Sequence, residues 1–295
     1  MSIFKTVMHR FTREEIQTWS SLRKTAYLLL PLLFYLLVHD GAEIALWAVI
    51  ELLMRSGAEG IQAFLTTYAG TVQGLVNGLA VLCGILVIGK GIRAEIWQEE
   101  LQESDKQLPD EKLSEKVTVY GFLAAMAFLV SIGVNILFYQ LGITEGSQSF
   151  SQVKEVQYDV QFAIGLLLYG VVSPIAEEAV FRGVIYNRMK RCFSYGIALV
   201  VSALLFGCYH GNVVQTLYGS LLGLLIAYVY EIFCSFAAPV AFHSVANISV
   251  FVMTYHNSLS ELKKPAALML ATVMLLAASG ILIGLKKKLL NKGTA

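Results

Sequence analysis

Long apolar stretches alternate with short polar connections along the 295 residues of the chain. A helix that crosses a membrane needs about 20 consecutive, mostly apolar residues, and the pattern indicates eight candidate spans. Their approximate ranges are 25–54, 62–90, 118–142, 160–181, 194–211, 214–233, 237–256 and 266–285. We therefore predict an all-α fold, a polytopic membrane helix bundle of about eight transmembrane helices.

The composition supports this interpretation. Hydrophobic residues make up 56% of the chain and charged residues 15%, whereas an ordinary soluble domain is about 45–50% apolar and about 25% charged. These values argue against a soluble globular domain and against disorder. The formal net charge of +1 gives no basic surplus for nucleic acid. The lipid bilayer is therefore an expected partner, and nucleic acid is not.

Lys and Arg are distributed unevenly between the connections. Of the 22, 18 fall in residues 1–24, in residues 90–116, in residues 182–191 and in the tail after residue 285. Lys and Arg concentrate in the cytoplasmic loops of membrane proteins. The distribution therefore predicts that both termini lie in the cytoplasm, which agrees with an even number of spans.

The spans divide the chain into four parts. We expect a cytoplasmic N-terminal segment at 1–24 and N-terminal transmembrane helices at 25–159, with a charged cytoplasmic loop at 91–117. Residues 160–256 form the core that carries the candidate chemistry, and 257–295 hold the last transmembrane helix and a basic cytoplasmic tail. The loop contains eight acidic residues and three lysines. We predict a solvated loop with some amphipathic helix, and a docking site for a partner is the alternative.

Charged residues cluster at the end of the span 160–181, where Glu177, Glu178 and Arg182 follow Pro174. Charged groups inside membrane spans are costly, so each is a candidate for a functional site. Residues i and i+4 share a helix face, so we expect Glu178 to pair with Arg182. Glu177 points about 100° away and needs another partner. The alternative is an ion cluster at a helix end without a catalytic role.

Two later spans contribute histidines. His210 follows Phe206 by one helical turn at the end of the fifth span, and His243 and Asn247 are i and i+4 in the seventh. A single histidine in a span often only bonds neighbouring helices. A carboxylate, two histidines and an amide on three spans are instead the groups that a reaction site contains.

The spacing suggests how these groups could meet. Glu177 and His210 are equally distant from a predicted turn near Phe193 and Ser194, so an antiparallel hairpin with equal arms would place them side by side. Simple straight spans put His243 nearer the cytoplasmic face than His210. Bringing the two histidines level requires a bent or broken helix near Gly211.

These groups suit the hydrolysis of a peptide bond. A carboxylate in a water-poor cavity can take a proton from water. A neighbouring histidine can orient that water or protonate the leaving amine, and the amide of Asn247 can donate to a developing oxyanion. Two histidines and one glutamate are also a catalytic zinc ligand set, so Glu177, His210 and His243 could hold one divalent metal such as zinc. The residues leave metal-free and metal-dependent chemistry open.

The motifs resemble those of a known family, the CPBP family of intramembrane proteases, which includes CAAX prenyl endopeptidases and bacteriocin-processing or bacteriocin-immunity proteins, also called Abi proteins. The matching positions are Glu177-Glu178-xxx-Arg182, Phe206-xxx-His210 and His243-xxx-Asn247, together with the flanking residues Pro174-Ile175-Ala176 and Phe181-Arg182-Gly183. The resemblance covers about residues 160–256. It implies a hydrolase that is an integral membrane protein. In a bacterium this membrane would be the plasma membrane.

The resemblance also implies a role for each motif position. Glu177 would activate water, and His210 and His243 would bind the water or a metal and handle the proton. Asn247 would stabilise the oxyanion. The remaining three positions would have supporting roles, with Glu178 beside the base, Arg182 as its counter-charge and Phe206 lining the cavity.

The expected function is therefore that of a metallo- or glutamic intramembrane endopeptidase that cuts a membrane-associated peptide or protein. The alternative is a non-catalytic immunity or scaffold protein that acts on a partner in the membrane or cell envelope. A transporter is a third hypothesis. The sequence shows no internal repeat, which argues against it.

One further polar group interrupts the first apolar stretch, at His39, Asp40 and Glu43. We interpret it as the polar face of a kinked or short span that faces the bundle. The alternative is a second polar contribution to the cavity.

Overall fold

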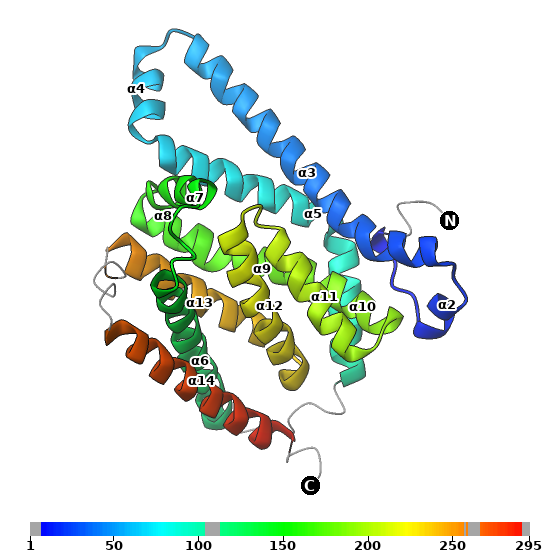
Figure 1. The fold of residues 1–295 in the computed structure, drawn as a ribbon. Helices are drawn as coiled ribbons and strands as arrows, with labels where there is room; N and C mark the ends of the chain where they lie inside the picture. The colour runs from blue at the N-terminus through cyan, green and yellow to red at the C-terminus, as the bar shows by residue number, and fades with distance from the viewer. Residues whose placement is uncertain (1–6, 104–112, 257, 259–265, 291–295) are drawn as a thin grey trace. The chain divides into compact units, whose positions relative to one another are not determined.

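The computed structural model describes residues 7–103, 113–256, 258 and 266–290 of the chain. Throughout these residues the secondary structure is helical, without a β-strand, as predicted (Figure 1). The elements are α2 (Arg13–Gln17), α3 (Ser21–Arg55), α4 (Glu59–Thr67), α5 (Ala69–Glu103), α6 (Leu113–Gln140), α7 (Gln148–Tyr158), α8 (Phe162–Leu167), η2 (Leu168–Val172), α9 (Ser173–Glu178), η3 (Ala179–Tyr186), α10 (Asn187–Cys192), α11 (Tyr195–Cys208), α12 (Val213–Phe233), α13 (Ala237–Tyr255) and α14 (Ala266–Leu290). The elements η2 and η3 are π-helical.

Seven helical stretches among the described residues are long and apolar enough to cross a membrane, and they correspond to seven of the eight predicted spans. The eighth, α11, is apolar but has only 14 residues. It ends at Cys208 because Gly211 adopts a left-handed backbone conformation, with φ +72°. Glycine reaches this conformation without the steric cost of a side chain. The polytopic helical bundle is confirmed, and its fifth span is shorter than predicted.

Two other predicted boundaries were wrong. The second span begins at Ala69 instead of residue 62, because the short helix α4 ends at Thr67 and Tyr68 leaves the helical conformation. The fourth span does not end at residue 181 but continues through the basic residues to Cys192. Residues 182–191, predicted to be a connection, are therefore helical. The predicted loop 91–117 begins as part of α5, which runs to Glu103, and its residues 104–112 lie outside the described part.

The chain forms two compact units. The first contains residues 1–95 and 151–194, and the second contains residues 96–150 and 195–295. In the first unit, α4 connects the ends of α3 and α5 (Figure 1). Its N-terminal part has an aromatic core in which Phe11 and Trp19 pack edge-on against each other and against Tyr27.

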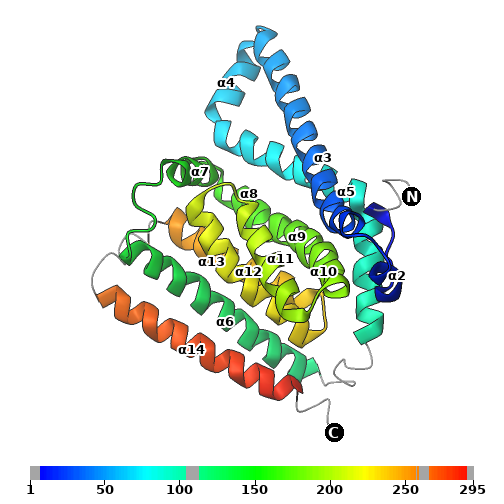
Figure 2. The same ribbon diagram turned by 45° about the vertical axis from the view of Figure 1, so that its right-hand side comes forward.

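In the second unit, α6 and α14 lie antiparallel and side by side (Figure 2). Gly133 of α6 allows this approach, because a Cβ there would lie 3.1 Å from the Leu275 side chain. The opposite long face of α6 packs against α13, and α11 packs against α12. An apolar cluster of buried residues joins α6, α12, α13 and α14.

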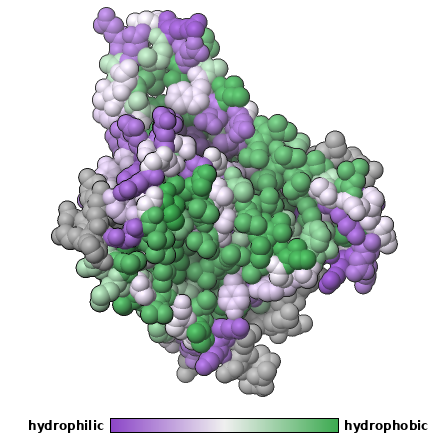
Figure 3. All heavy atoms as spheres, in the orientation of Figure 1, coloured by the Kyte–Doolittle hydropathy of each residue, from purple (hydrophilic) through white to green (hydrophobic). Residues whose placement is uncertain are grey.

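Large apolar side chains also cover outward surfaces (Figure 3). Leu86 of α5 is 79% exposed and Met269 of α14 is 75% exposed. Soluble monomers rarely expose contiguous apolar patches of this kind. Together with the seven long apolar helices, these surfaces identify a multi-pass integral membrane protein.

Candidate active site

Glu177 lies in a continuous helix that extends from Phe162 to Cys192 through α8, η2, α9, η3 and α10. Pro174 stands in the first turn of α9 and directly follows the π-helical η2. Proline has no N–H, and its ring crowds the carbonyl group one turn earlier. The wider π-helical turns accommodate this irregularity. Short π-helical stretches inside α-helices are rare and often occur at functional sites.

Glu178 and Arg182 form the predicted i,i+4 pair. Arg182 Nη1 donates to Glu178 Oε1 at 2.8 Å, and the two side chains are 1% and 0% exposed. Removing one partner of such a buried pair costs about 3–5 kcal/mol, because the other charge stays buried. The pair therefore fixes the side of the helix on which Glu178 lies, and the adjacent Glu177 points to a different side.

Glu177 itself is partly exposed. It follows Ala176 and precedes Glu178, both of which are buried. One residue step turns an α-helix by about 100°, so Glu177 borders the buried side of the helix without belonging to it. The residue as a whole is thus partly exposed, although its Oε2 atom is buried.

The two predicted histidines of the second unit meet at one phenyl ring. The ring of Phe206 packs edge-on against His210, with 5.2 Å between centroids, and edge-on against His243, with 5.5 Å between centroids. Phe206 and His243 are buried, whereas His210 is partly exposed. The two histidines reach one ring because the chain breaks near Gly211, as the sequence analysis requires: α11 ends at Cys208, and Gly211 has φ +72°.

Close packing of α11 on α12 holds His210 in place. A Cβ at Gly207 would lie 2.4 Å from the carbonyl oxygen of Thr216, and a Cβ at Gly219 would lie 3.5 Å from Nδ1 of His210. Small residues at such contacts let helix backbones approach closely in membrane proteins. The glycines of this contact therefore determine how near the imidazole of His210 lies to α12.

The Nδ1 atom of His210 lies 3.0 Å from the carbonyl oxygen of Phe206. In the tautomer that carries hydrogen on Nδ1, the ring donates to this carbonyl group and keeps Nε2 as an acceptor or a metal ligand. Asn247 lies on α13 one turn after His243 and is partly exposed. The second unit thus presents two imidazoles around one phenyl ring and an amide on the same helix as one of them.

The candidate groups come from both units. Glu177, Glu178 and Arg182 belong to the first unit, and Phe206, His210, His243 and Asn247 belong to the second. The turn predicted between them is present, since α10 ends at Cys192 and Phe193 is extended, with φ −131°. The approach of Glu177 to the histidines stays a prediction.

A buried ion cluster escaped the sequence analysis. Glu95 of α5 is fully buried, and both its oxygens bind guanidinium groups. Arg188 Nε donates to Oε1 at 2.8 Å, and Arg191 donates to Oε2. Because these residues are charged, the sequence analysis places them in solvated cytoplasmic connections. They lie instead in helices, since the helices continue to Cys192 and to Glu103.

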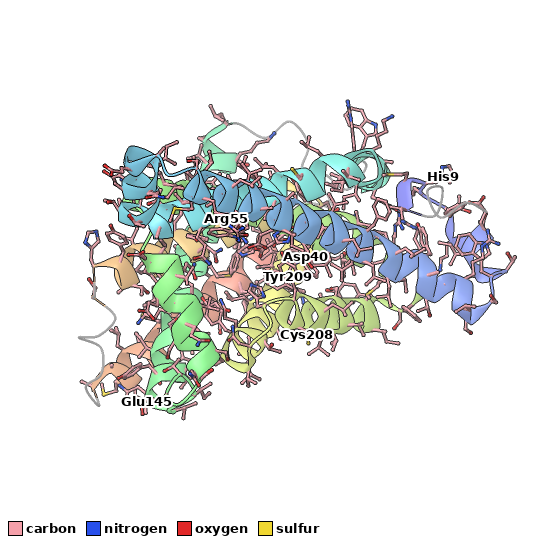
Figure 4. All side chains as sticks on the ribbon, turned by 90° about the horizontal axis from the view of Figure 1, so that it is seen from above. His9, Asp40, Arg55, Glu145, Cys208 and Tyr209 are labelled. Carbon is pink, nitrogen blue, oxygen red and sulfur yellow. The ribbon has the colours of Figure 1, made fainter. Side chains whose placement is uncertain are left out.

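The polar group of the first span lies on a single helix, because α3 is continuous over 35 residues and is not a short span. His39 is 8% exposed, and its Nδ1 lies 2.9 Å from Oδ1 of Asp40. Asp40 lies along the length of α3, away from both ends (Figure 4). A surface hollow of about 500 Å³ follows this face and is lined by Asp40, Glu43 and further residues of α3 as far as Glu51. None of the predicted site residues lines it.

The fold defines a class, that of helical integral membrane proteins, and the candidate glutamate and histidines lie on its helices. Residues 159–249 match the family model of Rce1-like type II CAAX prenyl endopeptidases. The chain is also 25% identical over 224 residues to the protein named "Putative membrane peptidase YdiL" of Bacillus subtilis (strain 168), which covers 75% of this chain and 86% of that protein. Both matches agree with the resemblance to the CPBP family. No solved structure matches it.

Proposed function

We propose that this protein is an intramembrane endopeptidase that hydrolyses a peptide bond at the membrane with water activated by Glu177. The family match supports a membrane protease of the CAAX-protease type. The observation that carries the proposal is the packing of both histidines around Phe206, within the segment that matches the family model. Ionisable groups inside membrane spans are costly and often mark a functional site.

In the proposed reaction, Glu177 takes a proton from water as the water oxygen attacks the scissile carbonyl carbon. Asn247 donates a hydrogen bond from its amide to the oxygen that becomes negative. The proton taken from water is passed through a histidine to the amine nitrogen as the carbon–nitrogen bond breaks, which returns Glu177 and the histidine to their starting states. Arg182 balances the charge of Glu178, and Phe206 keeps the two imidazoles apart. The substrate is a membrane-associated peptide or protein.

A divalent metal such as zinc is the alternative to a metal-free reaction, although no three His, Cys, Asp or Glu side chains among the described residues lie together as a metal site. His210 bonds the Phe206 carbonyl oxygen through Nδ1, an arrangement that commonly orients a metal-ligating imidazole so that Nε2 faces the ion. His210 and His243 would hold the ion together with Glu177, and the ion would supply Lewis-acid chemistry toward the scissile carbonyl group.

The test is turnover by the full-length protein in detergent or liposomes, first with a panel of quenched fluorescent peptides, prenylated CAAX peptides included. Glu177→Gln keeps the shape of the side chain and removes the base, so we expect turnover to fall by about 10²–10⁴-fold. Glu51→Gln is the matched control, because Glu51 is an exposed carboxylate of α3 that pairs with Arg55 of the same helix. Turnover by Glu177→Gln equal to that of the control would refute the assigned role.

Metal dependence has its own measurement. Metal content is determined by mass spectrometry for the purified protein and for a His210→Ala, His243→Ala double variant. A metal that is present in stoichiometric amount and lost from the variant assigns the ion to these histidines. Equal metal content in both proteins, with chelator-resistant turnover, assigns the reaction to the metal-free glutamate mechanism.

The CPBP family also contains immunity proteins. The second candidate function is therefore that of a non-catalytic immunity or scaffold protein. A scaffold acts through its surface, so it needs Glu177 only for folding. If Glu177→Gln and the wild type protect or signal equally in cells, while no peptide is cut by either protein, the scaffold hypothesis replaces the proposed reaction.

A further inference from the structure

The helix that carries Glu177 is attached to the N-terminal part of the chain at its C-terminal end. Besides Glu95, Arg188 binds two backbone carbonyl groups, with Nη1 2.8 Å from the oxygen of Tyr27 and Nη2 2.8 Å from the oxygen of Val7. The Tyr27 hydroxyl lies 2.9 Å from Nη2 of Arg191. Arg188 and Glu95 are fully buried. Charge-assisted bonds of this kind are about twice as strong as neutral ones, so this end of the helix is firmly held.

The same helix is attached to α5 at its other end. The backbone N–H of Gln161, which precedes α8, donates to the hydroxyl of Thr71 at 3.0 Å. The contact is tight, because a Cβ at the adjacent Gly70 would lie 2.4 Å from Oδ2 of Asp159. Two anchors, at Thr71 and at Glu95, thus connect α5 to the two ends of the helix that contains Glu177.

The anchors are not equally spaced on the two helices. Thr71 and Gln161, the partners of the first anchor, are 90 residues apart in the sequence. Glu95 and Arg188, the partners of the second anchor, are 93 residues apart. The helix with Glu177 therefore holds three more residues between its anchors than α5 does. Three residues of an α-helix are about 4.5 Å long. A π-helix closes each turn with an additional residue and so packs more residues into the same length.

The π-helical stretches accommodate the three additional residues between the anchors. The elements η2 and η3 flank α9, the short α-helical segment that contains Glu177 and Glu178. Since π-helical turns have poorer geometry than α-helical ones, they persist only where the surroundings hold them. Inside η3, Arg182 bonds Glu178, and the Asn187 side chain bonds the Gly183 carbonyl oxygen at 3.2 Å.

We propose that Glu95, Arg188 and Thr71 are positioning residues, which hold the Glu177 helix between two anchors on α5 and thereby keep the π-helical turns that set the direction of the Glu177 side chain. Release of one anchor lets η3 relax toward an α-helix. The relaxation lengthens the segment after Glu177 and rotates Glu177 relative to α10. This inference deepens the proposed function, since it names residues that act on the reaction through Glu177.

A distance within the first unit tests the inference without any activity. Nitroxide labels are placed at Ile175→Cys and Phe193→Cys, which are 45% and 41% exposed, in a full-length protein whose four native cysteines are serine. Pulsed electron resonance then gives the distance across η3. Glu95→Gln is expected to lengthen it by up to about 4.5 Å. Glu51→Gln, the exposed carboxylate of the same unit, is expected to leave it unchanged.

Two further variants keep the test decisive if Glu95→Gln does not fold. Thr71→Val removes only the hydroxyl group at the opposite anchor, and Arg188→Lys keeps the charge but not the fork that binds two carbonyl groups. Both are expected to lengthen the distance, and Arg188→Lys less than Arg188→Ala. An unchanged distance in the folded anchor variants would overturn the inference, whatever the turnover.

Turnover separates positioning from simple stability. For a substrate that the wild type cuts, the anchor variants are expected to lower kcat at least tenfold with KM within threefold of wild type, because Glu177 is displaced while the binding surface remains. A wild type without turnover refutes the proposed function but leaves the distance test valid. A longer distance with unchanged kcat in an active protein would refute the positioning role.

Discussion

Gly207 offers the sharpest test of how the histidine half of the site is built. Its hydrogen atom faces α12 at the closest contact between α11 and α12, one turn before His210. A Cβ at this position would lie 2.2 Å from Oγ of Ser220 and 2.4 Å from the carbonyl oxygen of Thr216. The hydroxyl group can rotate away, but the carbonyl oxygen belongs to the backbone of α12 and cannot.

The magnitude follows from this contact. Ordinary contacts of a Cβ begin near 3.4 Å, so Gly207→Ala has to separate the two backbones by about 1 Å. Overpacking of this kind costs about 1–3 kcal/mol. The separation also moves the imidazole of His210 relative to Gly219 of α12, so we expect turnover to fall more than stability alone accounts for.

The assay compares thermal unfolding in detergent and turnover for Gly207→Ala and Gly196→Ala. Gly196 is on the same helix, and a Cβ there meets nothing within 4 Å. Alanine at Gly196 is expected to be neutral or to stabilise slightly, because alanine favours helix over glycine by about 0.5–1 kcal/mol. If Gly207→Ala is as stable and as active as Gly196→Ala, the close approach of the two helices does not hold His210, and the reasoning fails.

Three more predictions concern other residues of the two units. Arg182→Ala should destabilise the protein by about 3–5 kcal/mol in chemical unfolding, and adding Glu178→Gln should recover part of the loss; a double variant no better than the single one would show that the pair is not the cause. Phe206→Leu should keep the fold but lower kcat by more than tenfold in a turnover assay, because the ring that separates the imidazoles is lost; unchanged kcat would contradict this. His39→Ala and Asp40→Asn should leave turnover within twofold of wild type, and a larger loss would give the polar face of α3 a part in the reaction.

The residues that the sequence predicted correctly interact over short distances along the chain. Glu178 and Arg182 are one helical turn apart, so the helical period alone pairs them. Glu95 and Arg188 are 93 residues apart, and no local rule connects them. Their charge instead favoured solvated connections, and the ends of the two helices were correspondingly placed too early. The period also could not show the π-helical turns around Glu177, because these depend on contacts at both ends of the helix.

The relative depth of the histidines illustrates a different limit. A count of residues assumes that each apolar stretch crosses the bilayer completely, which placed His243 away from His210. The helix α11 has 14 residues, and the turn at Gly211 satisfies its backbone locally, with the Asn212 side chain accepting from the N–H of Gln215 at 2.9 Å. Hydropathy gives the presence of an apolar segment more reliably than its end.

The shortness of α11 also concerns the supply of a reactant. The helix is about 21 Å long, against about 30 Å for the hydrocarbon core of a bilayer. At one of its ends the chain therefore turns back about 9 Å before the lipid does, and the polar turn of Tyr209, His210, Gly211 and Asn212 occupies that depth. Lipid tails cannot solvate such a turn. A polar turn at that depth would give water a place to bind near His210, and hydrolysis consumes one water molecule for each bond it cuts.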